Sequence, residues 1–194
     1  TIRSDGPEHH ASKSGIPTMG GLLILVTFLG STLLWANLGS RYIWVVIFSV
    51  IGFGAIGFRD DVLKLRRGDG ISAKEKITLQ LLVSLGIGIY LLYFDPTRSD
   101  YATRLSVPFF KEFQPDLGFL YPFFIVFIIV GTSNAVNLTD GLDGLAIMPA
   151  VMIISALGGF AYLGGNIIFS DYLDIPYING AGELVIYSAA LAGA

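Results

Sequence analysis

The sequence contains no cysteine and few charged residues. The missing thiols exclude disulfides, thiol catalysis and cysteine metal sites. Asp, Glu, Lys and Arg make up only 14% of the 194 residues, whereas a soluble domain has about 25%. There is no broad basic stripe, so we expect no nucleic-acid partner, and the net charge of −3 is too small to indicate a polyanionic one. These absences favour a membrane protein over a soluble one.

Apolar residues make up 53% of the chain and gather in long runs that are nearly free of charge. A helix needs about 20 mostly apolar residues to cross a bilayer. We therefore predict an all-α polytopic membrane protein, with five complete transmembrane helices and the start of a sixth, forming a single membrane domain over 1–194. The predicted spans are 19–37, 42–58, 77–94, 117–134, 142–163 and the incomplete 183–194.

Several spans are rich in glycine, as in the segments 52–54 and 86–88. In an apolar helix, glycine is more often a close-packing device than part of a site. We therefore expect these glycines to lie where helices approach one another.

Lys and Arg orient the spans, because positive residues gather on the cytoplasmic side. One set of connecting segments holds Arg3, Lys13, Arg59, Lys64, Arg66, Arg67, Lys74 and Lys76, and the other set holds Arg41, Arg98, Arg104 and Lys111. The first set is larger, so we predict that 1–18, 59–76 and 134–140 face the cytoplasm. Segments 95–116 and 164–182 then face outward, and 95–116 could hold a short hairpin or an interfacial segment.

Two polar clusters lie at the predicted cytoplasmic side. Asp60 and Asp61 directly follow the second span, and the segment 134–144 joins the fourth span to the fifth. Ionisable groups at membrane depth are costly and are usually functional. Together these carboxylates and carboxamides favour a site over two unrelated groups of charges.

The spacing in the second cluster suits a phosphate-binding metal site. If the segment is helical, Asn134, Asn137 and Asp140 recur every three residues and share a face, with Asp143 three residues further on. Hard oxygen ligands suit Mg²⁺, which usually links one or two carboxylates to a phosphate. A carboxylate that is not bound to metal is free to deprotonate or orient a nucleophile.

Each group also has an ordinary structural interpretation. Asp60 and Asp61 are compatible with a solvated helix end beside Arg59 and Lys64. The asparagines are compatible with helix caps or polar contacts between helices, and the cytoplasmic lysines with the positive-inside bias alone. The position of all these groups on one side of the membrane favours the site.

Three segments, 13–21, 58–61 and 134–146, resemble the phospho-N-acetylmuramoyl-pentapeptide transferase (MraY) family of polyprenyl-phosphate N-acetylhexosamine-1-phosphate transferases. The likeness runs through essentially the whole chain, with the order of spans intact. It implies transfer of phospho-N-acetylmuramoyl-pentapeptide from its UDP-linked precursor to undecaprenyl phosphate, which gives lipid I and UMP. It also implies a Mg²⁺ cofactor and an active site on the cytoplasmic face of the bacterial cytoplasmic membrane.

The resemblance assigns roles to single residues. Asp60 would be the base acting on the lipid phosphate, with a direct nucleophilic role as the alternative, and Asp61 would assist it. The catalytic residues would be Asp60, Asp61 and Asp140. The metal ligands would be Asp61 and Asp140, with a further ligand outside this chain. The substrate-binding residues would be Lys13, Thr18, Lys76, Asn134, Asn137, Gly141, Leu142 and Asp143.

The resemblance also bears on completeness. Family members are about twice as long and have ten spans, so it implies that this chain lacks the first span and the C-terminal half of a longer protein. We expect the 194 residues alone to be inactive. The resemblance suggests a homodimer, although no interface can be identified in the sequence.

Three other functions stay open at this point. The nearest is a sibling transferase that moves N-acetylglucosamine-1-phosphate to a polyprenyl phosphate. A transporter would carry its acidic residues near the bilayer midplane, whereas these lie at span ends. The third is a non-catalytic membrane binding partner, which predicts that Asp60→Asn in the full-length protein leaves activity unchanged.

Overall fold

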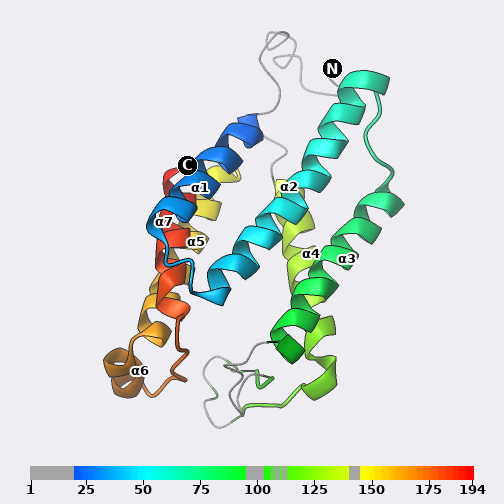
Figure 1. Ribbon diagram of the computed structural model, residues 1–194. Helices are drawn as coiled ribbons and strands as arrows, with labels where there is room; N and C mark the ends of the chain where they lie inside the picture. The colour runs from blue at the N-terminus through cyan, green and yellow to red at the C-terminus, as the bar shows by residue number, and fades with distance from the viewer. Residues whose placement is uncertain (1–19, 95–102, 106, 108–109, 111–112, 140–144) are drawn as a thin grey trace.

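The computed structural model describes residues 20–94, 103–105, 107, 110, 113–139 and 145–194, and most of these are helical (Figure 1). This confirms the predicted all-α class. The α-helices are α1 (Gly20–Trp35), α2 (Arg41–Arg67), α3 (Ala73–Ile89), α4 (Tyr121–Thr139), α5 (Ile147–Gly165), α6 (Ile167–Leu173) and α7 (Leu184–Gly193). Short 3-10 or π segments adjoin them at Tyr90–Phe94, Gly118–Leu120 and Ala181–Glu183.

Four of these helical segments are long and apolar enough to cross a membrane: Arg41–Arg67, Ala73–Tyr93, Gly118–Thr139 and Ile147–Gly165. They correspond in order to the second, third, fourth and fifth predicted spans. The first predicted span contains α1, whose 16 residues extend over about 24 Å, less than the ~30 Å hydrocarbon core. The last contains α7.

The second helix does not end where its apolar run ends. The predicted span stopped at Phe58, but α2 continues to Arg67, so Asp60 and Asp61 are helical residues with a further turn and a half beyond them. At 27 residues α2 is about 40 Å long, more than the hydrocarbon core requires. Gly68, with φ 84°, ends the helix in the left-handed conformation. The hydropathy pattern predicts where the apolar span ends, whereas Gly68 determines where the helix ends.

The third helix also begins earlier than its apolar run. α3 starts at Ala73, before the predicted Ile77, because the Ser72 side chain accepts a hydrogen bond from the Glu75 backbone N–H at 3.2 Å. A serine cap with glutamate three residues later is a helix-start signal that can be read from sequence. The cap places Lys76 in the first turn of α3.

The predicted outward segments differ from expectation in two places. Helix α6 was not predicted; Asn166 caps it by accepting hydrogen bonds from the N–H groups of Ile168 and Phe169. For 95–116, where either a short hairpin or an interfacial segment was open, the described residues of that segment form a single antiparallel bridge between Arg104 and Asp116. Neither feature touches the cluster around Asp60.

The helices form two groups joined by α2. Helices α1, α5 and α7 pack together on one side, α3 packs against α4 on the other, and α2 contacts α1, α3 and α7. The end of α2, the start of α3, the end of α4 and the start of α5 lie at one end of the molecule (Figure 1). This alternation brings Asp60, Asp61 and the described part of the second polar cluster, residues 134–139, to the same end, as the predicted parity of spans requires.

Glycines allow close helix contacts, as expected. A Cβ added at Gly52 would lie 2.8 Å from a methyl group of Val83, and one at Gly88 would lie 3.0 Å from the Cα of Pro122. Gly54 meets Leu25 in the same way, whereas Gly86 has open space around it. Small residues at such contacts let membrane helices pack without a hydrophobic driving force. The contacts of Gly52 and Gly88 hold α3 against both α2 and α4.

Candidate active site

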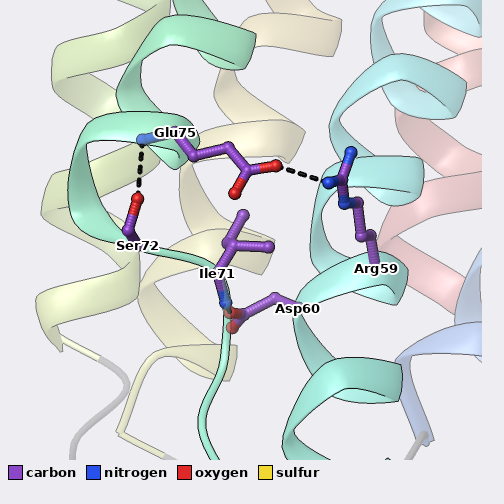
Figure 2. A network of polar contacts seen from close by, with 5 residues as sticks. All are labelled: Arg59, Asp60, Ile71, Ser72 and Glu75. Atoms are coloured by element: carbon purple, nitrogen blue, oxygen red, sulfur yellow. Dashed lines mark hydrogen bonds and ion pairs between the residues drawn. The ribbon is translucent and has the colours of Figure 1, made fainter.

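Asp60 occupies a nearly enclosed position between α2 and the segment 68–72. Its side chain is 13% exposed. Its Oδ1 accepts a hydrogen bond from the Ile71 backbone N–H at 2.8 Å, and its Oδ2 forms an ion pair with Lys64 one turn later on α2. Figure 2 shows Asp60 directed at Ile71 across the gap between the two segments. The carboxylate is therefore fixed in position by a backbone donor as well as by a side chain.

This geometry depends on the turn that follows α2. After Gly68 the chain folds back toward α2, and Gly70 comes so close to Asp60 that an added Cβ would overlap Oδ1 of the carboxylate. The same Cβ would lie 2.9 Å from Cε of Lys64. Glycine is the residue that allows such a close approach of backbone to a side chain. The pair of glycines in 68–70 is the sequence signal that could have predicted this turn.

Asp61 is more open than Asp60. Half of its side chain is exposed, and its Oδ1 lies 3.7 Å from the Nζ of Lys64. Lys64 thus lies between the two carboxylates and partly neutralises both. Arg59 forms a further ion pair with Glu75 of α3 at 2.5 Å (Figure 2), which ties the charged end of α2 to the start of α3.

Lys76 belongs to the same cluster. It lies half-buried in the first turn of α3, next to Glu75, which forms the ion pair with Arg59 of α2. The structure therefore brings together Asp60, Asp61 and Lys76 from the predicted set. It adds Lys64, which is absent from the predicted set and forms the ion pair with Asp60.

The asparagines lie on the last turns of α4, which is helical through Thr139 as the spacing required. Asn137 is exposed. Asn134 instead donates from Nδ2 to Oε1 of Gln80 on α3 at 2.8 Å and to the backbone carbonyl of Val130 at 2.8 Å. This contact matches the alternative interpretation of Asn134 as a polar link between helices, and its predicted role in substrate binding stays a prediction.

Residues 43–194 match the sequence profile of glycosyl transferase family 4. The chain belongs to this family. Residues 13–25 match phospho-N-acetylmuramoyl-pentapeptide-transferase signature 1, which confirms the resemblance drawn from segments 13–21, 58–61 and 134–146. The protein is therefore a membrane-embedded phospho-sugar transferase of glycosyl transferase family 4, and the signature in residues 13–25 implies a bacterial membrane.

The family match covers α2 and every helix that follows it. The Asp60 cluster and the Asn134–Gln80 contact therefore lie inside the matched region. Six predicted site residues lie outside the described residues: Lys13, Thr18, Asp140, Gly141, Leu142 and Asp143.

The described residues suit a metal only in part. Among them, no three His, Asp or Glu side chains gather as a ready-made metal site. Asp61 has the properties of one ligand, because its side chain is half exposed and its Oδ1 lies 3.7 Å from the Nζ of Lys64. Mg²⁺ keeps several waters and is usually bound by one or two carboxylates together with substrate phosphates. One open carboxylate at the end of α2 fits that pattern.

Proposed function

We propose that this family 4 enzyme transfers phospho-N-acetylmuramoyl-pentapeptide from its UDP-linked precursor to undecaprenyl phosphate, releasing UMP and forming lipid I. The observation that carries the proposal is the match of residues 13–25 to the signature of that transferase. The clustering of Asp60, Asp61 and Lys76 at one end of the helices supports it.

The reaction is an exchange at phosphorus. An oxygen of the lipid phosphate forms a bond to the phosphorus that bears the sugar, and the bond from that phosphorus to the oxygen bridging it to UMP breaks. UMP leaves with the bridging oxygen and its electron pair. Little covalent chemistry falls to the protein in such transfers, so positioning and charge neutralisation carry most of the catalysis.

Asp60 is the proposed base. A carboxylate has about four lone-pair positions, and the Ile71 N–H and the Lys64 ammonium occupy only part of this capacity. The remaining positions are available to accept a proton from the lipid phosphate. Fixing the carboxylate in advance avoids reorganisation when the proton moves.

Asp61 and Asp140 are the proposed holders of Mg²⁺, which would neutralise charge on the diphosphate when bound. Lys76 and Asn137 would contact phosphate or ribose oxygens, Lys76 as a point charge. The site would face the cytoplasm, since its segments belong to the set richer in Lys and Arg. One substrate would then arrive from water and the other from the bilayer.

The test is UMP release by the full-length protein in nanodiscs that contain undecaprenyl phosphate. We expect release with UDP-N-acetylmuramoyl-pentapeptide and little with UDP-N-acetylglucosamine. The opposite preference would identify the sibling N-acetylglucosamine-1-phosphate transferase. No release with either sugar nucleotide would reject both transferase assignments and favour a binding role.

Asp61→Asn should weaken the binding of the Mg²⁺ that the transfer requires. Losing even an outer-shell partner costs about 10–100-fold in metal affinity, so loss of a direct carboxylate ligand is expected to raise the half-saturating Mg²⁺ concentration at least about tenfold. The measurement is UMP release against Mg²⁺ concentration after EDTA treatment. An unchanged Mg²⁺ curve would show that Asp61 does not hold the metal.

A further inference from the structure

Two amide side chains join α3 to α4 one turn away from the Asp60 cluster. Gln80 is only 2% exposed, and its Oε1 accepts the hydrogen bond from Asn134 Nδ2. The same Nδ2 donates to the carbonyl of Val130. Because a carbonyl oxygen can only accept, Asn134 must present its amino group here, and Gln80 must therefore present its oxygen. The side-chain amides of Asn134 and Gln80 therefore each have one orientation that satisfies these hydrogen bonds.

Stability alone does not explain this pair. Hydrogen bonds between membrane helices contribute little to stability, and burying a polar amide is costly unless it is paired. Gln80 shares its buried face of α3 with Ser84 and Gly88, small residues that already allow α4 to pack closely. The best-attested role of a buried polar group between helices is to specify register.

Register matters because predicted substrate residues lie one turn further along both helices. Lys76 precedes Gln80 by four residues and Asn137 follows Asn134 by three, so each shares a face with its amide neighbour. The start of α3 and the end of α4 lie at the same end of the molecule (Figure 1). Sliding or rotating α4 against α3 would move Asn137 relative to Lys76 and Asp60.

We propose that Gln80 is a positioning residue for the transfer site. By holding Asn134, it fixes the end of α4 that carries Asn137 against the start of α3 that carries Lys76. Gln80 acts through Asn134 and touches neither substrate. This inference rests on the proposed function, since it concerns the placement of residues that the transfer would use.

The test compares Gln80→Asn and Asn134→Gln with the double variant in the full-length enzyme. Each single change alters the combined length of the linkage by one methylene, and a displacement of about 1 Å can cost about 100-fold in rate. We expect each single variant to raise KM for the UDP-sugar and to lower kcat/KM by about 10- to 100-fold. The exchange of the two amides restores the linkage, so the double variant should recover most of the loss.

Two further variants separate positioning from packing. Ser84→Ala changes the next turn of the same buried face, where the hydroxyl has no hydrogen-bond partner, and it should leave KM and kcat unchanged. Gln80→Met keeps the side-chain length but removes the acceptor, and it should reproduce the effect of Gln80→Asn. If Gln80→Asn folds poorly, Gln80→Met and the double variant provide the same comparison.

The results distinguish this inference from the proposed function. A purely structural role would reduce the amount of folded enzyme and leave KM unchanged, which would overturn the positioning role. A double variant as impaired as Asn134→Gln would also overturn it, since Asn134 would then act by itself. In either case an unmodified enzyme that releases UMP from UDP-N-acetylmuramoyl-pentapeptide would retain the proposed function, whereas absence of that release would reject the function whatever Gln80 does.

Discussion

Replacing Asp60 by asparagine is expected to lower kcat for UMP release by about 10²- to 10⁴-fold, the usual contribution of a general base. The amide oxygen of asparagine can still accept the hydrogen bond from the Ile71 N–H, so the turn after α2 should stay in place. The variant removes the negative charge and the proton acceptor and little else. We therefore expect normal folding and binding of the UDP-sugar with a large loss of rate.

The matched control for this variant is Asp69→Asn. Asp69 is an exposed carboxylate in the same turn, and its replacement makes the same change of charge close to the site. We expect its kcat to stay within about twofold of the unmodified enzyme, because single exposed charges contribute little in water. If both variants lose activity equally, local charge rather than the base function of Asp60 is responsible. If Asp60→Asn remains fully active, Asp60 is not the base.

The sequence predicted the helices and the parity of their ends well, because the cost of placing peptide groups in lipid forces apolar runs to be helical. It did not predict where the helices end. The apolar run ends at Phe58, but α2 continues to Arg67, and Gly68 then adopts a left-handed conformation. Asp60 and Asp61 are therefore residues of a helix and not of a connecting loop. Their position relative to α3 follows from that difference.

The partners of the site residues were harder to predict than the residues themselves. Asp60 is held by the backbone N–H of Ile71, a donor that every residue except proline carries, so nothing in the sequence singles it out. Gln80 is one polar residue in an apolar span, and its partner Asn134 is 54 positions away. Such pairings follow from packing of distant helices, which a single sequence does not reveal. Helix α6, with seven residues, was too short for the span criterion.

Replacing Gly70 by alanine is expected to lower kcat by about 100-fold, the cost of a displacement of about 1 Å at a reacting group. The added Cβ would overlap the Asp60 carboxylate. Either the turn moves away and the hydrogen bond from Ile71 is lost, or the carboxylate rotates away from its fixed position. The measurement is kcat for UMP release, with thermal stability followed in parallel.

Gly57→Ala is the matched control, because a Cβ at Gly57 on α2 meets open space and should leave kcat unchanged. A second comparison tests whether Gly70 acts through Asp60. If it does, adding Gly70→Ala to Asp60→Asn should cause little further loss, since effects of residues that act as a unit do not add. If the losses of the two single variants multiply in the double variant, Gly70 serves another part of the site. Full activity of Gly70→Ala would show that the enzyme does not need the fixed carboxylate, and this would remove the main structural reason for choosing Asp60 over Asp61 as the base.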